Sequence, residues 1–290
     1  MKRTINRIIP AQRVNMGGIL LDQPLPMRDV EQIDPFLLVH HWDDKLPGNQ
    51  SEKELGVGPH PHRGFSPVTL IFKGAVHHRD SLGTKSIIEA GGAQWMNSGK
   101  GIIHSERPPK YMAENGGEFE FIQFWANTPA SKKMEPAKYQ PLTAEQTPNV
   151  TSEDGKVSAG IVAGKALGKE GPIELMTPML VMRFDIQKGG KMEVDIPENF
   201  NAFFYQLDGK LGFDGTTTKA KDLTWFKNDG KSISFEGLEN TRAILLAGEP
   251  INEPLATYGP FVMNNQTQIM EALRDYQMGK MGVLIEEFDS

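Results

Sequence analysis

Two short segments of this sequence each place two metal-binding side chains two positions apart. His60 and His62 flank Pro61, and His104 and Glu106 form a similar couple further along the chain. Side chains at positions i and i+2 of a β-strand point to one face of a sheet, and Pro61 restricts His60 to an extended conformation. If the two strands lie side by side, three imidazoles and one carboxylate converge. The spacing therefore predicts a metal site formed by His60, His62, His104 and Glu106.

The other histidines form two adjacent pairs, His40-His41 and His77-His78, and no histidine follows His104. Neighbouring residues of a strand point to opposite faces, so neither pair can chelate as a pair. At most one member of each pair could face the site, as a group behind the ligands. We predict structural roles for all four and expect His78→Ala to leave the metal content nearly unchanged.

The predicted ligand set restricts the metal only broadly. The chain has no cysteine, so zinc-thiolate sites and cysteine nucleophiles are ruled out. Imidazole and carboxylate ligands suit iron, manganese, nickel, cobalt, zinc or copper. Four protein ligands on an octahedral ion leave two positions open for water, a chelating substrate or dioxygen, whereas a structural site is more often a closed tetrahedral zinc site. We favour non-haem iron.

Short apolar stretches separated by glycine turns recur along the chain. Close, even spacing of such stretches is typical of an all-β barrel or sandwich. The same rhythm returns in the second half, with Asp-Gly pairs at hairpin positions, which indicates an internal duplication. The clearest predicted strands are 68–72, 119–125, 179–186, 202–207 and 243–247.

The composition divides the chain into three predicted regions. Residues 1–130 contain every histidine and form the expected metal-binding barrel. Residues 131–156 are rich in Pro, Lys, Ser, Thr, Gln and Glu and are expected to connect the domains. Residues 157–290 form a second barrel without metal ligands, which ends in a helix.

That C-terminal helix is predicted over Gln266–Met278. Asn265 or Thr267 can cap its N-terminus, and Gly279 follows its last residue. Its apolar residues fall roughly on one face, as expected for a helix that packs on a β-barrel. They are Ile269, Met270, Leu273 and Tyr276.

The charge balance disfavours several classes of partner. With 31 basic and 37 acidic residues, the formal net charge is -6, which gives no general attraction to nucleic acid or anionic membranes. Lys132-Lys133 is too short for a nucleic-acid patch and is expected to form a solvated turn. No window reaches the ~18 apolar residues of a membrane span, and the N-terminus lacks the apolar run of a signal peptide. We expect a soluble, cytoplasmic protein.

Several segments of the sequence resemble the pirins, which belong to the cupin superfamily. The resemblance covers nearly the whole chain and is most specific around the two predicted ligand couples. It implies a bicupin: two stacked antiparallel β-barrels of the jelly-roll type and a short C-terminal helix. The segments that carry it are His60–Phe65, Gln94–Met96, Gly99–Glu106, Gln123–Asn127 and Lys132–Gln140.

The resemblance also implies a cofactor. Pirins hold a single iron in the N-terminal barrel through three histidines and a glutamate, and these positions correspond to His60, His62, His104 and Glu106. The sequence departs from the wider cupin pattern at Ser66, where many relatives have a glutamate. Because the pirin carboxylate ligand comes from the later segment, we expect metal binding to be retained.

Two functions of different classes follow from the resemblance. Several pirins are quercetinases, which open a flavonol ring with dioxygen and release carbon monoxide; Glu106 would then be both a ligand and a proton acceptor. Other pirins are regulators that bind a transcription factor or a metabolic enzyme in a metal-dependent manner. A metal-dependent isomerase or another small-molecule cupin has a compatible ligand set. We expect dioxygenase activity on a small aromatic substrate, with regulatory binding of a protein partner as the alternative.

Overall fold

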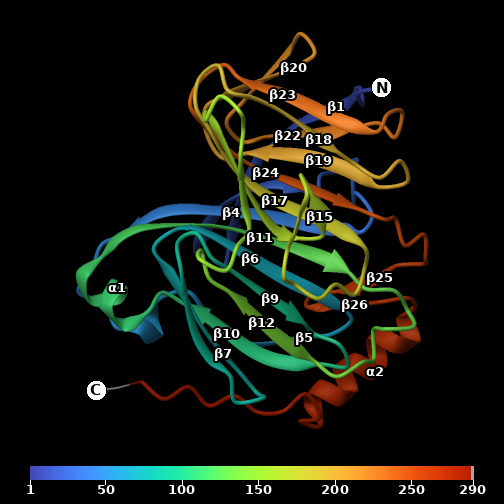
Figure 1. Ribbon diagram of the computed structural model, residues 1–290. Helices are drawn as coiled ribbons and strands as arrows, with labels where there is room; N and C mark the ends of the chain where they lie inside the picture. Colours follow the sequence, from blue (N-terminus) through green and yellow to red (C-terminus); the bar gives the residue numbers. More distant parts are fainter. Residues whose placement is uncertain (289–290) are drawn as a thin grey trace. The chain divides into compact units, whose positions relative to one another are not determined.

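The computed structural model describes residues 1–288 and divides the chain into two compact β-units (Figure 1). Unit 1 comprises Met1–Leu38 and Glu145–Pro250, and unit 2 comprises Val39–Ala144 and Ile251–Ser290. Each unit thus contains two separate stretches of the chain. The expected domains were continuous and differ from these units at both ends. The reason is that the N-terminal strand pairs within unit 1, while the C-terminal helix packs within unit 2.

Unit 1 consists of two antiparallel sheets with an apolar core. Side chains from both sheets form that core, and Phe204 packs against Phe184 and Phe235. Two strand pairs complete the unit. They are the hairpin of β2 (Gln12–Met16) and β3 (Ile19–Leu25) and the short pair of β15 (Lys165–Ala166) and β16 (Lys169–Glu170). The larger sheet has the order β1 (Ile5–Pro10), β22 (Asp222–Phe226), β19 (Asn201–Gln206), β24 (Thr241–Gly248), β17 (Met179–Ile186), β14 (Val157–Ala163), β13 (Asn149–Thr151). The smaller has the order β18 (Lys191–Asp195), β23 (Ser232–Gly237), β20 (Lys210–Phe213), β21 (Thr216–Lys219).

Unit 2 has the same two-sheet plan. One sheet has the order β5 (Val57–His62), β10 (Ile102–Arg107), β7 (Ala75–Asp80), β8 (Lys85–Glu89). The other contains β12 (Lys138–Leu142), β9 (Ala93–Asn97), β6 (Phe65–Lys73), β11 (Gly117–Asn127) and β4 (Phe36–Leu46), in that order. The remaining elements are η1 (Glu52–Glu54), α1 (Lys110–Asn115), β25 (Ala256–Tyr258), β26 (Phe261–Met263) and α2 (Gln266–Gln277).

The expected all-β fold with two antiparallel barrels is confirmed. The predicted strands 68–72 and 119–125 lie inside β6 and β11, and the repeated rhythm corresponds to the shared two-sheet plan. The predicted connector, 131–156, is more ordered than expected. It contains β12 and β13, which pair with β9 and β14 and thereby become edge strands of their sheets. The short helix α1 was not predicted.

The C-terminal helix begins and ends close to the predicted positions. Asn265 is its N-cap and accepts a hydrogen bond from the backbone N–H of Gln268. The predicted apolar face is correct for Ile269 but wrong for Met270, which is 64% exposed. Ala272 is buried in its place, because it lies nearly one turn from Ile269 and so shares its face. No helix within residues 1–288 is long and apolar enough to cross a membrane.

Candidate metal centre

The two predicted ligand couples lie on neighbouring antiparallel strands. His60 and His62 are on β5, His104 and Glu106 are on β10, and His104 lies directly opposite His60. Beyond this pair the register shifts, since Glu106 lies opposite Val57. Strand β5 therefore carries an extra residue there, a β-bulge of the kind that often re-aims side chains beside functional sites.

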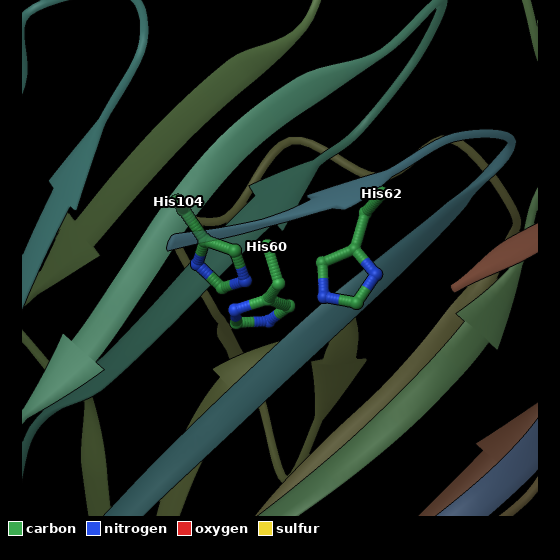
Figure 2. A group of neighbouring side chains, drawn as sticks. All are labelled: His60, His62 and His104. Carbon is green, nitrogen blue, oxygen red and sulfur yellow. The ribbon is translucent and has the colours of Figure 1, made fainter. Parts of the chain in front are cut away.

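Three imidazoles lie close together beside this bulge (Figure 2). One ring nitrogen from each of His60, His62 and His104 lies within 4.8 Å of the others. The ring centroids are 4.4 Å apart for His60 and His104, 4.7 Å for His60 and His62, and 4.9 Å for His62 and His104. His62 and His104 are almost fully buried and His60 is half-buried. Such a group of nitrogens can hold a metal ion.

Hydrogen bonds on the far side of each ring leave its other nitrogen available. His60 Nδ1 lies 2.8 Å from the carbonyl oxygen of Gly58, and His62 Nδ1 lies 3.4 Å from that of Pro260. A carbonyl oxygen only accepts, so both Nδ1 atoms carry the proton and both Nε2 atoms keep a lone pair. His104 Nε2 is buried and has no hydrogen-bond partner within the protein. A buried nitrogen without a partner is costly unless a ligand satisfies it, so this atom fits a bound metal.

The electrostatics of the group also favour metal ligation. Burial lowers the pKa of His62 and His104 well below the usual histidine value, and the neighbouring histidines lower each pKa further. Both rings are therefore neutral near pH 7. A neutral imidazole is the form that binds a metal, because the protonated form has no lone pair to donate.

The carboxylate of Glu106 is held beside this group by three neutral donors. Its Oε1 accepts hydrogen bonds from Thr69 Oγ1 at 2.9 Å and from Gln94 Nε2, and its Oε2 accepts one from Gln123 Nε2 at 2.7 Å. Glu106 does not belong to the three-histidine group itself. A carboxylate has about four acceptor positions, so one remains for a ligand or a proton.

These three donors form one cross-strand row. Thr69 on β6 lies opposite Gln94 on β9 and Gln123 on β11, so all three side chains point to the same face of the sheet. No role for these three residues was predicted from the sequence. Alternation alone cannot distinguish such polar side chains from ordinary sheet residues, because their partner, Glu106, is on a different sheet.

His78 lies behind a predicted ligand, a position that was expected for at most one member of each histidine pair. Its Nδ1 lies 3.4 Å from His104 Nδ1, and its Nε2 lies 3.0 Å from Asp80 Oδ2. The neighbouring His77 faces the other side of β7 and pairs with Glu52 at 2.8 Å. His78 thus contacts His104, a predicted ligand. We predicted that His78→Ala would leave the metal content nearly unchanged, without knowledge of this contact.

A second acidic and imidazole cluster in unit 2 has a different character. His41, Asp43 and Glu120 also bring potential ligand atoms within 4.8 Å of one another. Here, however, Lys73 Nζ lies 3.1 Å from Glu120 Oε2 and 3.5 Å from Asp43 Oδ1. The ammonium group already supplies the positive charge that a metal ion would bring, so this cluster is a structural ion-pair network, in agreement with the structural role predicted for His41.

Ser66 and Arg63 form hydrogen bonds away from the imidazoles. Ser66, at the position of the usual cupin glutamate, donates a 2.8 Å hydrogen bond to Asn97 Oδ1. Arg63 Nε donates to the carbonyl oxygen of Lys100 at 2.7 Å, and both terminal nitrogens lie 3.1 Å from Asp275 Oδ2 on α2. Arg63 therefore anchors the segment that follows His62.

The predicted solvated turn at Lys132-Lys133 is wrong for Lys133, which is 1% exposed. Its Nζ donates hydrogen bonds to Gly64 O at 2.6 Å, to Asn127 Oδ1 at 2.7 Å and to Val262 O at 3.0 Å. Three acceptors match the three hydrogens of an ammonium group, which explains how a lysine is tolerated at a buried position. Burial nevertheless lowers the pKa of Lys133 to about 7.

Aromatic side chains lie beside the imidazoles. Phe65 and Trp125 have ring centroids 5.0 Å and 5.6 Å from that of His62, and they are 4.4 Å from each other. Phe65 is fully buried and Trp125 is half-buried. The surroundings of the three rings thus combine a polar side, around Glu106, with an apolar aromatic side.

Comparisons with known proteins match most of the chain. The family model Pirin matches residues 19–126, and the model for the pirin C-terminal cupin domain matches residues 181–282. A pirin-like protein of Solanum lycopersicum is 35% identical over 97% of this chain and 93% of its own length. Pirin-1 of Arabidopsis thaliana is 34% identical over 96% of this chain and 94% of its own.

A solved structure is similar over the whole molecule. The crystal structure of quercetin 2,3-dioxygenase from Acinetobacter baumannii superposes with a TM-score of 0.92 and is 31% identical in sequence. The match covers 98% of this chain and 100% of the chain from Acinetobacter baumannii.

Proposed function

This chain belongs to the pirin family, and we propose that it is an iron-dependent dioxygenase that opens the ring of a flavonol such as quercetin. Its two β-units are the two barrels of the bicupin fold. The similarity to a quercetin 2,3-dioxygenase supports the choice of substrate class. The unpartnered, buried Nε2 of His104 supports the metal centre most directly.

His60, His62 and His104 would hold the iron through their Nε2 atoms, and Glu106 would be the fourth ligand. A metal ion held there acts as a Lewis acid and lowers the pKa of a hydroxyl group bound to it. An ion with four protein ligands would leave positions open for substrate, and a flavonol offers its 3-hydroxyl and 4-carbonyl oxygens as a chelating pair.

Glu106 would also accept the proton of the substrate 3-hydroxyl. Its carboxylate is fixed by Thr69, Gln94 and Gln123, which leave one acceptor position, so Glu106 would accept that proton in place of its bond to the metal. Neutral amide and hydroxyl donors orient the carboxylate without supplying a competing positive charge. Phe65 and Trp125 would exclude water and pack against the aromatic substrate.

Aerobic turnover of quercetin by the iron-loaded protein tests this proposal. We expect loss of flavonol absorbance by the wild-type protein and severe loss of activity in Glu106→Ala. Lys165→Ala is a matched control, because Lys165 is an exposed residue of unit 1 whose ion pair with Glu170 is on the surface. Full iron occupancy without turnover by the wild-type protein would refute the enzymatic proposal and favour metal-dependent binding of a protein partner.

A further inference from the structure

We propose that Asp80 and His78 fix the proton of His104 on Nδ1 and so keep its Nε2 free to bind a metal. The inference rests on the metal centre of the proposed function and adds two positioning residues to it. It concerns the chain Asp80 Oδ2, His78 Nε2, His78 Nδ1 and His104 Nδ1, in which successive contacts measure 3.0 Å and 3.4 Å. All three side chains are buried, at 2% exposure or less.

The strand register brings these residues together. Along β7 and β10, Asp80 lies opposite His104 and His78 lies opposite Glu106, so His78 is the diagonal neighbour of His104 on the same face. Figure 2 shows His104 among the other two predicted ligands, and its ring centroid lies 5.3 Å from that of His78. The contact between His78 and His104 thus follows from the sheet geometry.

The proton positions follow from donor and acceptor chemistry. An ionised carboxylate only accepts hydrogen bonds, so the nitrogen of His78 that faces Asp80, Nε2, must carry a proton. With one proton on the ring, the opposite nitrogen, Nδ1, is an acceptor. It can accept only from a protonated Nδ1 on His104, which leaves the Nε2 of His104 with its lone pair. The 3.4 Å contact is at the long end of the hydrogen-bond range.

Both positioning groups are themselves held firmly. Asp80 Oδ1 accepts hydrogen bonds from the backbone N–H groups of Leu82, at 2.9 Å, and Thr84, at 3.0 Å. The ring of Tyr139 stacks on His78 with a centroid distance of 4.0 Å and an interplanar angle of 15°. The carboxylate and the imidazole therefore have little freedom to turn away from each other.

The variant Asp80→Asn tests the inference with almost no change in shape. The two backbone donors keep the amide oxygen of the new residue at the Oδ1 position, so its NH₂ group must face His78. His78 then accepts at Nε2 and carries its proton on Nδ1. This drives the proton of His104 to Nε2, the atom that should bind the metal. The same tautomer reversal is the established consequence of an Asp→Asn change behind a catalytic histidine.

Affinity for Co²⁺, measured by competition with a chelator, is the first readout. Loss of an outer partner of a ligating histidine typically weakens metal binding ~10- to 100-fold, which is the expected effect of Asp80→Asn. His77→Gln is the matched control, since His77 lies on the same strand and faces Glu52 instead. Its affinity should equal that of the wild-type protein.

A double variant separates positioning from a structural role of Asp80. His78→Phe keeps the stacking on Tyr139 but removes both nitrogens, so Asp80→Asn should cause no further loss of Co²⁺ affinity in that background. If Asp80 acted only by holding the turn at Leu82 and Thr84, its replacement would cost the same affinity in both backgrounds. Equal costs would therefore overturn the inference.

Histidine side-chain ¹⁵N NMR of the metal-free wild-type protein gives a second readout, which does not depend on how a variant folds. We expect the Nε2–H tautomer for His78 and the Nδ1–H tautomer for His104. An Nε2 proton on His104, or wild-type Co²⁺ affinity in Asp80→Asn, would overturn the inference. If the wild-type protein bound no Co²⁺, the proposed metal centre would fall with it. If the variants lose Co²⁺ affinity as expected but the wild-type protein does not turn over quercetin, only the proposed reaction is refuted.

Discussion

The ion pair between Arg63 and Asp275 joins the segment after His62 to the C-terminal helix, and Asp275→Asn should destabilise the protein measurably. Both terminal nitrogens of Arg63 lie 3.1 Å from Asp275 Oδ2. The Arg63 side chain is 4% exposed and that of Asp275 is 14% exposed. The substitution leaves a buried guanidinium group without its counter-charge.

The size of the effect follows from the burial. Removing one partner of a buried ion pair costs about 3 to 5 kcal/mol. The amide introduced by the substitution would keep one acceptor oxygen for Arg63, and Asp275 is not fully buried, so we expect about 2 to 3 kcal/mol. For proteins somewhat smaller than this one, each kcal/mol shifts Tm by roughly 2 to 4 °C. The expected decrease in Tm is therefore about 4 to 12 °C, measured by calorimetry.

Arg274→Gln is the matched control on the same carboxylate. Arg274 lies 3.4 Å from Asp275 Oδ1 but is 62% exposed, so its pair should contribute less than about 0.5 kcal/mol. A decrease in Tm for Asp275→Asn no larger than for Arg274→Gln would refute the reasoning, because it would mean that burial of Arg63 does not strengthen the interaction.

Three further changes give distinct expectations. Gln123→Leu removes the 2.7 Å hydrogen bond to Glu106 Oε2 and should weaken Co²⁺ binding ~10-fold; unchanged affinity would show that this donor does not orient the carboxylate. For Glu52, burial acts to raise the pKa, but hydrogen bonds from His77 and Arg79 prevail and lower the pKa to about 2. This carboxylate therefore contributes about 3 kcal/mol of stability above its unfolded pKa of ~4.3, which is lost as the pH falls towards 2. Acid unfolding of Glu52→Gln should lack this component, and an identical pH profile would contradict the assignment. Lys133→Met leaves carbonyl oxygens without a donor and should lower the free energy of unfolding by about 2 to 4 kcal/mol in urea; an equally stable variant would contradict this.

The period of two along a strand, together with the assumption that the two strands pair, predicted the three-histidine group. His60, His62 and His104 share a face because their positions alternate correctly, and Pro61 favours the extended backbone that makes alternation apply. The position and the hydrogen-bond donors of Glu106 could not be predicted from the sequence. Its separation from the three-histidine group accompanies a bulge in β5, and its donors come from three strands of the other sheet.

Contacts between distant parts of the chain could not be predicted from local patterns. The carbonyl oxygen that faces His62 belongs to Pro260, in a segment that follows the whole second barrel. Lys133 illustrates the same limit, since two adjacent lysines are typical of a surface turn. Its burial depends on oxygens from Gly64 and Val262, which only the folded chain brings together. The role of His78 likewise depends on pairing between β7 and β10.

Metal analysis of freshly purified wild-type and His62→Ala protein, prepared side by side, shows whether the three imidazoles hold a metal ion. Three imidazoles converge in unit 2, and His62 contributes one of the buried, neutral nitrogens. We expect a single iron ion per chain in the wild-type protein and a sharp loss of metal in His62→Ala. Equal metal content in the two proteins, or a wild-type protein that retains no metal after reconstitution with iron, would contradict it.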